Sequence, residues 1–467
     1  KKKKGFTNQK ELNLFIKELK KNFPNLVELD YIGQTQKGKK IPIVYLSDKS
    51  FKDSKKIRIW MQGGSHGNEP ASTETLLFLI HELLHSLESR YLLEKIRFAF
   101  VPMLNIDGYL KNDRYSSNGL DLNRDHTKLM SPEIIASVQA FSKFDPHIAL
   151  DFHEYRPFRK DFAQLSTFGI SSIYDFMFLH SGNLNVSENL RFINDTLFVA
   201  NAKKSLDEFG FRHRHYMKSE KYKGEINFST GSNSARSSSN YYALSNAFAT
   251  LFEIRGVGIG KTSFKRRIKS GITVAFSYIK TAHKNYDFIL DQIELANNFS
   301  SHIVVEHVRT TSKEFIDAID IETNSKISME VVMHSSKESK ALKKINRPKA
   351  YVIKKNQTEI IEKLDINGIK TITIENDTTF SAGSYTVTAL KDDFKIYEKM
   401  KMQDVDVRID YSDIQFSKGD LILPMKQKKS NLIAELMEPE APNSYVSFGL
   451  IKTGINKILP IYRIREL

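Results

Sequence analysis

Short apolar segments alternate with helical segments over the first 300 residues, and this alternation limits the choice of fold. Apolar runs predict buried strands at residues 41–46, 57–62, 96–104 and 148–153. Apolar residues at helical spacing predict helices at 8–22, 72–93, 133–143, 193–209 and 240–251. Because strands that alternate with helices are typical of a mixed, mostly parallel sheet with helices on both faces, we expect an α/β fold.

The pattern changes near residue 300. Short strand-like runs dominate from there to the end of the chain, and only residues 356–365 look helical. The polar stretch LANNFSSH marks the change, so we predict one α/β domain over residues 1–300 and a β-rich accessory region of one or two domains over residues 301–467. Within the first domain, the Ser-, Asn- and Gly-rich segment 224–240 predicts a mobile loop.

The chain has no cysteine, which narrows its chemistry. A disulfide scaffold, an iron–sulfur cluster, a cysteine-based zinc site and a thiol nucleophile are all excluded. Any metal site must therefore use His, Asp or Glu.

Positive charge is concentrated at the start of the chain. The formal net charge is +15, and residues 1–60 carry 16 Lys and Arg against 6 Asp and Glu, beginning with Lys1–Lys4. This charge is not interleaved with aromatic residues along a groove, so we interpret it as solvated surface that can associate electrostatically with a cell wall or another anionic surface. No nucleic-acid recognition motif is present, and specific nucleic-acid binding is not expected.

The sequence also bears on where the protein acts. No apolar run approaches the roughly 20 residues that a membrane span needs, so we expect no transmembrane segment. The chain opens with four Lys and no Met. We therefore expect an exported protein, periplasmic or secreted, from which a signal has been removed.

Three residues indicate a metal site. In WMQGGSHGNEPAS, His66 and Glu69 occupy a glycine-rich turn after a predicted strand, and the His-x-x-Glu spacing lets both side chains reach one ion. His153 ends another apolar strand, and sites in open α/β sheets form at the carboxyl ends of strands. Two His and one Glu, with a fourth position left to water, form a catalytic zinc arrangement. Asp151, two residues before His153, is a candidate to orient a ligand imidazole.

Further polar residues follow other apolar runs. Arg114, Asn123 and Arg124 lie in the segment NDRYSSNGLDLNRDH and suit the binding of a carboxylate or a developing oxyanion. Glu253 ends the apolar run NAFATLF, where a carboxylate beside a metal-bound water is a candidate general base. Two simpler interpretations remain open: the metal-site residues could be a hydrogen-bonded turn and a buried histidine, and Glu253 could pair with Arg255.

In their order along the chain, these motifs resemble the zinc carboxypeptidases related to carboxypeptidase A. The resemblance covers about residues 8–290, and the C-terminal runs GDLILPMKQ, LMEPE and LPIYRI resemble secreted bacterial multidomain members. The motifs are HGNE from His66, N-x-D-G from Asn105, Arg114 with GLDLNRD, D-x-H-x-Y from Asp151 to Tyr155, and Glu253.

The resemblance assigns a role to each motif. It implies one zinc ion on His66, Glu69 and His153, and a terminal carboxylate of the substrate on Asn123 and Arg124. It implies that Arg114 stabilises the oxyanion, and that Glu253 activates water and then protonates the leaving amine; Tyr155 becomes a candidate substrate contact. The activity it implies is hydrolysis of the amide bond next to the free C-terminal carboxylate of a peptide. Cell-wall peptides are among the candidate substrates.

The sequence departs from the family pattern at two places. Ile106 replaces a proline that is usual in the N-x-D-G motif, and the loop before Glu253 lacks a tyrosine until Tyr241 and Tyr242, although the family often has a substrate-capping tyrosine there. Counting back from Glu253 without gaps puts Ser238 at the floor of the family's specificity pocket, with Arg236 two residues earlier; a plain loop charge is the alternative interpretation of Arg236. Arg236 therefore predicts a preference for acidic C-terminal residues.

Three alternatives stay open. His81-Glu82-Leu83-Leu84-His85 spells the H-E-x-x-H signature of another zinc protease class, but the two histidines fall on the polar side of the predicted helix. HGNE also occurs in the desuccinylase and aspartoacylase branch, which would make the protein an acyl-amino-acid amidase. A non-catalytic zinc-containing binding module is the third alternative. Two other histidines, His126 and His147, are expected on the surface.

Overall fold

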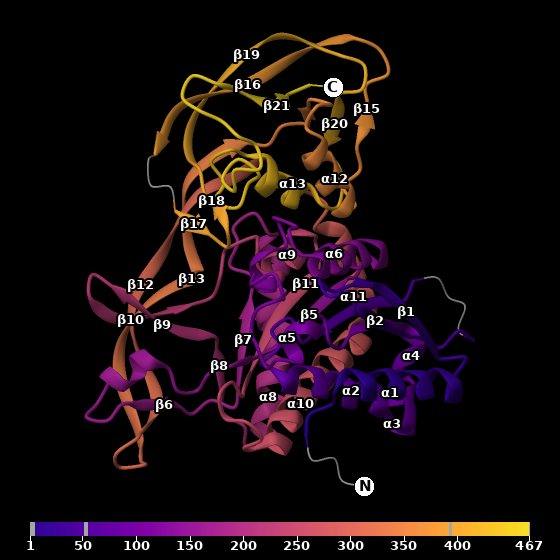
Figure 1. Ribbon diagram of the computed structural model, residues 1–467, viewed down its shortest axis with the longest axis vertical. Helices are drawn as coiled ribbons and strands as arrows, with labels where there is room; N and C mark the ends of the chain where they lie inside the picture. Colours follow the sequence, from indigo (N-terminus) through magenta and orange to yellow (C-terminus); the bar gives the residue numbers. More distant parts are fainter. Residues whose placement is uncertain (1–4, 51–54, 392–394, 467) are drawn as a thin grey trace.

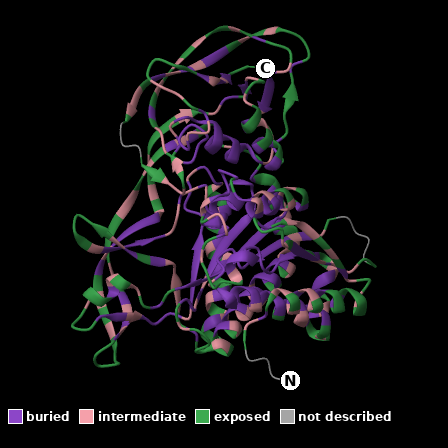
Figure 2. Ribbon diagram, viewed as in Figure 1, coloured by how far each residue is buried: buried purple, intermediate pink, exposed green. Residues whose placement is uncertain are grey.

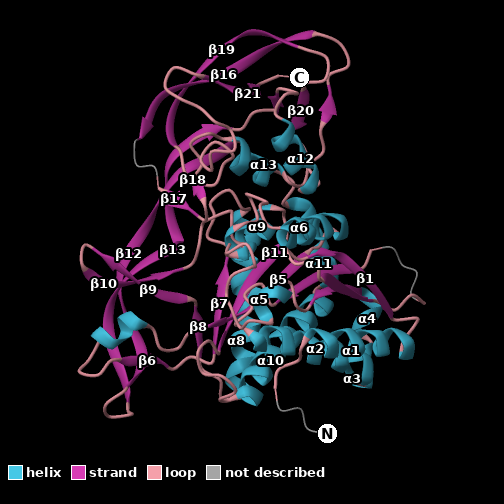
Figure 3. Cartoon of the chain, in the orientation of Figure 1, coloured by secondary structure: helices cyan, strands magenta, loops and turns pink. Residues whose placement is uncertain are grey.

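The computed structural model describes residues 5–50, 55–391 and 395–466 (Figures 1 and 3). The basic opening Lys1–Lys4 lies outside these ranges. The central element is an eight-stranded sheet in the order β1-β2-β4-β3-β5-β11-β7-β8. Its strands are β1 (Val27–Gln34), β2 (Lys40–Leu46), β3 (Ile57–Gly63), β4 (Ile96–Val101), β5 (Ile148–Tyr155), β7 (Phe176–His180), β8 (His213–His215) and β11 (Phe248–Arg255).

The central sheet is mixed, and its middle is parallel. Strands β4, β3, β5 and β11 pair in parallel, whereas β2 is antiparallel to both of its neighbours and β7 is antiparallel to β11. Every residue of β5 is buried, as expected for a strand that is covered on both faces. The predicted α/β fold with a mixed, mostly parallel sheet is confirmed.

Helices cover both faces of this sheet. Helix α6 packs on β1 and β3, α2 packs on β3 and β5, and α10 packs on β11 and α2, so that the sheet lies between α6 and α9 on one side and α2, α8 and α10 on the other (Figure 1). The resulting core is continuous and buried (Figure 2). The α-helices of this part are α1 (Gln9–Asn22), α2 (Pro70–His85), α3 (Leu87–Arg90), α4 (Leu92–Lys95), α5 (Ile106–Tyr109), α6 (Pro132–Phe144), α7 (Glu188–Ile193), α8 (Ala200–Glu208), α9 (Ser238–Leu244), α10 (Phe264–Lys284) and α11 (Tyr286–Leu295). No helix within the described ranges is long and apolar enough to cross a membrane.

The C-terminal part is β-rich, as predicted, but its strands are longer than the sequence indicates. Strands β12 (His302–Asp320) and β13 (Lys326–Asn346) form a long antiparallel hairpin. This hairpin completes a five-stranded sheet with β6 (Ile170–Ser172), β9 (Met217–Tyr222) and β10 (Glu225–Thr230), which all precede residue 300.

Two further sheets follow the long hairpin. A six-stranded sheet contains β14 (Ala350–Ile353), β15 (Ile372–Thr373), β16 (Thr378–Lys391), β19 (Asp404–Phe416), β20 (Leu421–Pro424) and β21 (Ile458–Ile464). A small hairpin consists of β17 (Ile396–Tyr397) and β18 (Met400–Lys401). Helices α12 (Thr358–Ile366) and α13 (Ser430–Met437) accompany them, and α13 was not predicted.

Several predicted elements end elsewhere. The helix predicted over 72–93 ends at His85, and Leu87, just beyond that end, is 80% exposed. The helix predicted over 240–251 ends at Leu244, because the apolar run that follows is the central strand β11.

The predicted mobile loop over 224–240 is also wrong. The segment holds β10 and the start of α9. Its polar side chains bond to one another inside the protein: the Asn240 amide donates to the Ser232 and Ser237 hydroxyl groups at 3.1 Å each.

Candidate metal centre and substrate cleft

The turn that carries His66 and Glu69 joins β3 to α2 and requires glycine at two places. Gly64 has a φ of +66°, a conformation that side chains other than glycine rarely adopt. A Cβ atom on Gly67 would lie 2.0 Å from the carbonyl carbon of Gly108. The HGNE turn and the N-x-D-G turn are therefore packed backbone against backbone.

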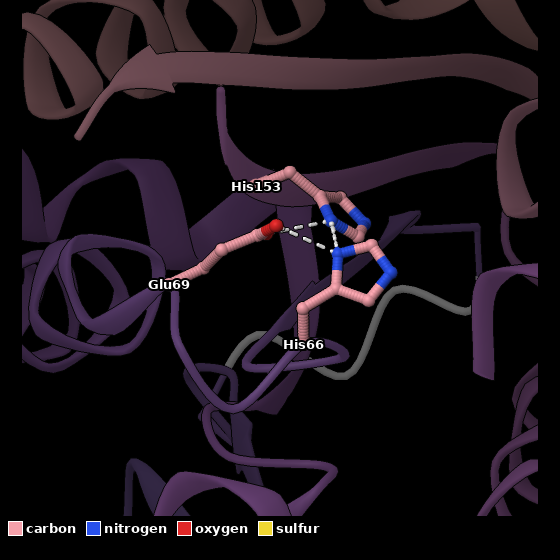
Figure 4. Close-up of side chains that lie close together, drawn as sticks. All are labelled: His66, Glu69 and His153. Atoms are coloured by element: carbon pink, nitrogen blue, oxygen red, sulfur yellow. Dashed lines mark hydrogen bonds and ion pairs between the residues drawn. The ribbon is translucent and has the colours of Figure 1, made fainter. Parts of the chain in front are cut away.

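The structure brings His66, Glu69 and His153 together in the buried interior (Figure 4). The two Nδ1 atoms of His66 and His153 lie 3.0 Å apart. Glu69 faces both rings, with Oε1 at 2.7 Å from His66 Nδ1 and Oε2 at 2.9 Å from His153 Nδ1. Three potential ligand atoms thus converge from the turn after β3 and from β5.

Each imidazole is held from its far side by an aspartate. His66 Nε2 lies 3.0 Å from Asp121 Oδ1, and His153 Nε2 lies 2.9 Å from Asp151 Oδ2. A carboxylate on Nε2 fixes the proton there and leaves the Nδ1 lone pair facing its partner. Asp151 thus has the contact expected of it, whereas Asp121, which lies two residues before Asn123, was not predicted.

The electrostatics of the site suit a divalent cation. Burial raises the pKa of Glu69, but His66 and His153 outweigh burial and hold that pKa well below its ordinary value. Burial lowers the pKa of His153, but Asp151 and Glu69 raise it well above its ordinary value. Facing Nδ1 atoms beside a buried carboxylate are a donor set that fits zinc.

Glu253 lies beside this group on β11. Parallel pairing of β11 with β5 puts Glu253 directly opposite His153. Burial and the charge of Glu69 raise the pKa of Glu253 to about 8. The neighbouring Arg255 donates through Nε to the Ser172 carbonyl group at 3.3 Å.

Arg114 connects the metal-site residues to the cleft. Its Nε and Nη2 atoms donate to Asp121 Oδ2 at 3.1 and 2.8 Å, and its Nη1 lies 3.2 Å from His66 Nδ1. Burial lowers the pKa of Arg114, but Asp121 and Glu69 raise it above its ordinary value. The guanidinium is therefore a fixed cation at the edge of the site.

Asn123 and Arg124 lie on a short 3₁₀ turn next to Arg114. The side-chain Oδ1 atom of Asn123 accepts a hydrogen bond from the Ser238 backbone N–H at 2.8 Å. Arg124 Nη1 donates to the backbone carbonyl of Asn123 at 2.7 Å. Within the described residues, Arg124 has no ion pair with a carboxylate. Its charge is available to a ligand.

The candidate residues line one cleft of about 590 Å³. Of the predicted site residues, His153 and Asp151 are not among those that line it. Tyr155 lines the cleft, but its hydroxyl donates to the Tyr174 carbonyl and lies 3.1 Å from Ser172 Oγ. The members of the predicted set on the cleft wall are His66, Glu69, Arg114, Asn123, Arg124, Tyr155, Arg236 and Glu253.

Arg236 enters the cleft from the loop before α9. It has no carboxylate partner among the described residues; its Nε donates to Tyr397 Oη and its Nη1 to Asn443 Oδ1, both at 3.0 Å. Tyr241 and Tyr242 are fully buried in α9 and do not reach the cleft, whereas Tyr216, which was not predicted, lines it.

Two histidines that were expected on the surface are buried. His126 is 1% exposed and packs against the rings of Tyr241 and Tyr242. His147 is 8% exposed, and its Nδ1 accepts the backbone N–H of Arg58. Burial lowers the pKa of His126 to about 4 and that of His147 to about 3, so both rings are neutral at pH 7.

The H-E-x-x-H segment does not form a comparable group. His81 and His85 stack with their ring centres 4.0 Å apart, and His85 is exposed. In the described part of the chain, neither belongs to a group of three potential ligands.

A second such group exists away from the cleft, formed by His180, Asp195 and His215. Lys337 Nζ already lies 3.2 Å from Asp195 Oδ2 and 3.1 Å from His215 Nε2. A lysine ammonium thus supplies the cation there, and we assign no metal to this group.

Comparison with known proteins finds a family match and several similar chains. Residues 12–169 match the zinc carboxypeptidase family. The chain is 28% identical over 447 residues to Carboxypeptidase 2 of Trichophyton rubrum, and the match covers 92% of this chain and 82% of that protein. It is 25% identical over 210 residues to Carboxypeptidase B of Helicoverpa zea, covering 38% and 48% of the two chains. A crystal structure of a metallo-carboxypeptidase from Burkholderia cenocepacia is similar over 60% of this chain and 70% of its own, with a TM-score of 0.47 and 16% identity.

Proposed function

We propose that this chain, whose residues 12–169 match the zinc carboxypeptidase family, removes the C-terminal residue of peptides with one zinc ion held by His66, Glu69 and His153. The observation that carries this assignment is the convergence of both Nδ1 atoms on Glu69 while each Nε2 is held by an aspartate. When bound there, zinc would polarise the scissile carbonyl and lower the pKa of water.

Glu253 supplies the proton transfers. Its place opposite His153 puts a carboxylate beside the zinc ligands, and its raised pKa brings it into the range in which a group both accepts and donates a proton near neutral pH. Glu253 first takes a proton from the attacking water and then delivers it to the leaving amine. The atoms balance because the amide becomes a carboxylic acid and a free amine at the expense of one water.

Two arginines of the cleft each bind a different negative charge during the reaction. Arg114 is held by Asp121 through two bonds, which leaves Nη1 directed at the metal-site residues to stabilise the developing oxyanion. Arg124, assisted by Asn123, binds the terminal carboxylate of the substrate, because a guanidinium fork matches a carboxylate with two hydrogen bonds.

Arg236 sets the preference for the side chain of the C-terminal residue. It lines the same cleft as Arg124, and it has no carboxylate partner among the described residues. A partly buried, unpaired guanidinium favours a ligand that brings a carboxylate and disfavours an apolar one. We therefore propose substrates that end in Glu, Asp or a diaminopimelate with a free second carboxylate, which includes cell-wall peptides. Tyr155 contributes only its ring to this wall.

The proposed place of action is outside the cytoplasm, at an anionic surface. The formal charge of +15 attracts the protein to a polyanionic wall, where such peptides occur. Sedimentation with purified cell walls in low and high salt tests this electrostatic association. Release at high salt is expected, whereas no binding at low salt would contradict it.

The test of the activity uses matched peptides that end in Glu, Leu and Lys, assayed with zinc and with a chelator. We expect zinc-dependent release of the last residue, fastest from the Glu peptide. Faster cleavage of the Leu or Lys peptide would refute the role of Arg236 and leave the carboxypeptidase assignment in place. Hydrolysis of N-acyl amino acids without peptide cleavage would favour the amidase alternative. Zinc binding without any hydrolysis would favour a binding module.

A further inference from the structure

The C-terminal region reaches the edge of the catalytic cleft. The β17–β18 hairpin lies against the loop that leads to Asn123: Glu398 Oε2 accepts the Asp121 backbone N–H at 2.9 Å, and Lys399 Nζ donates to the Asn118 carbonyl. Asp121 is the residue that holds His66 and Arg114. The hairpin therefore contacts the back of the site, although it is more than 270 residues away in sequence.

The same hairpin holds Arg236. The Arg236 guanidinium lies over the Tyr397 ring at 4.5 Å from its centre, and its Nε donates to the Tyr397 hydroxyl. Its Nη1 donates to Asn443, which follows α13. Both partners come from the region after residue 300, and both are uncharged. Asn443 is 2% exposed, so this anchor is fixed within the protein.

This arrangement restricts the motion of Arg236 and leaves it, among the described residues, without a carboxylate in hydrogen-bond contact, since Glu398 of the same hairpin acts on its charge only from a longer range. The structure gives Nη2 no partner in the part of the chain it describes. An arginine side chain loses considerable rotamer freedom when it binds a ligand, and fixing it beforehand lowers that entropic cost. Neutral partners orient the guanidinium without neutralising it, as a receptor for a carboxylate requires.

We propose that Tyr397 and Asn443 are positioning residues that determine specificity: they hold Arg236 so that its free edge receives the side-chain carboxylate of an acidic C-terminal residue. This inference rests on the proposed function and extends it. It makes the C-terminal region part of the specificity pocket rather than a separate accessory unit.

The test compares hydroxyl deletions at two tyrosines. Tyr397→Phe removes the acceptor for Arg236 and keeps the ring, and Asn443→Ala removes the other acceptor. Tyr411→Phe is the matched control, because Tyr411 on β19 also lies under an arginine, Arg465, but is outside the residues that line the cleft. For each variant, kcat and KM are measured on peptides that end in Glu and in Leu. The affinity for both peptides is measured by calorimetry in the zinc-loaded Glu253→Gln background.

We expect Tyr397→Phe to lower the Glu-to-Leu ratio of kcat/KM about tenfold, the scale of one charge-assisted hydrogen bond, through KM and affinity for the Glu peptide. Asn443→Ala should act in the same direction, and Tyr411→Phe should not change the ratio. In an Arg236→Ala background, Tyr397→Phe should have no further effect on the ratio, since the group that it positions is gone.

Other outcomes overturn the inference. Equal losses on both peptides would mean that Tyr397 only supports the fold, and an undiminished ratio would mean that Arg236 needs no positioning. A further tenfold loss in the Arg236→Ala background would assign Tyr397 an independent role. If the unmodified protein cleaves peptides but does not prefer Glu, the acidic pocket and this inference fail while the carboxypeptidase assignment stands. If it cleaves no peptide with zinc, the proposed function fails as well.

Discussion

Glu253 lies directly opposite His153 in the parallel pairing of β11 with β5. Residues that pair in parallel strands point to the same face of the sheet, so this register fixes a carboxylate beside the candidate zinc ligand. The pairing continues for eight residues from Phe248 with Ile148 to Arg255 with Tyr155. The position of the proposed general base is therefore set by the core of the protein rather than by a loop.

Glu253→Gln should retain zinc and fold but lose turnover. The amide keeps the shape of the side chain and cannot accept a proton, so kcat should fall about 100-fold or more. Steady-state kinetics on the best peptide, with metal analysis, checks this. Glu225→Gln, at the exposed first position of β10, is the control. Turnover near the normal rate in Glu253→Gln would remove this residue from the mechanism.

His66→Ala and His153→Ala should each abolish stoichiometric zinc binding. Each substitution removes one of the three side chains of the candidate metal group, and alanine offers no ligand atom in its place. Metal analysis after dialysis measures the loss. His81→Ala and His85→Ala serve as controls and should keep the metal. Loss of zinc in these two variants alone would show that the H-E-x-x-H helix, and not the group of His66, Glu69 and His153, binds the metal.

Asp121→Asn should weaken zinc binding about 10- to 100-fold, the usual effect of removing a carboxylate that orients a ligand histidine. Asp121 bonds to His66 Nε2 and to Arg114, so the variant should also lower kcat through the oxyanion contact. Competition with a chelator of known affinity measures the first effect. Asp113→Asn, at an exposed position in the same loop, is the control. An unchanged zinc affinity would show that Asp121 does not support the ligand.

Lys429 should make stability depend on pH. It is buried beside Ser142 Oγ and the Asn367 carbonyl, and burial, with Lys428 close by, lowers its pKa from 10.5 to about 7. Between about pH 7 and 10.5 the folded state binds fewer protons than the unfolded chain, so the free energy of unfolding rises with pH in this interval. Below pH 7 the full free-energy cost of burying the charged Lys429 side chain is present.

The measurement for Lys429 is the melting temperature of the unmodified protein and of Lys429→Met between pH 6 and 9. The stability of the unmodified protein relative to the variant should rise by up to about 3 kcal/mol over this interval. Exposed Lys370→Met gives the baseline. A difference that stays flat or falls with rising pH would contradict the buried cation at this position.

The candidate site could be predicted largely because its signals are local. His66 and Glu69 are three residues apart in a turn whose glycines mark tight backbone packing, and His153 and Glu253 each end an apolar run. Parallel strands bring such ends to one edge of the sheet, so spacing and strand order suffice to predict their convergence.

Other features depend on tertiary contacts that a single sequence does not contain. Tyr397 and Asn443 contact Arg236 across 161 and 207 residues, and nothing in their local segments indicates a site. His126 looks like a loop histidine, but the packing of Tyr241 and Tyr242 buries it. The segment 224–240 has the composition of a loop, but strand pairing with β13 and internal hydrogen bonds between its polar side chains order it.

The central claim is that the protein hydrolyses the amide bond next to a free C-terminal carboxylate by means of zinc. The most direct test is mass spectrometry of one peptide supplied as its free acid and as its C-terminal amide, with zinc or with a chelator. We expect loss of single C-terminal residues from the free acid with zinc only, and Arg124→Ala should reduce the preference for the free acid over the amide. Cleavage of the amidated peptide at an equal rate, cleavage at internal bonds, or activity that persists in the chelator would contradict the claim.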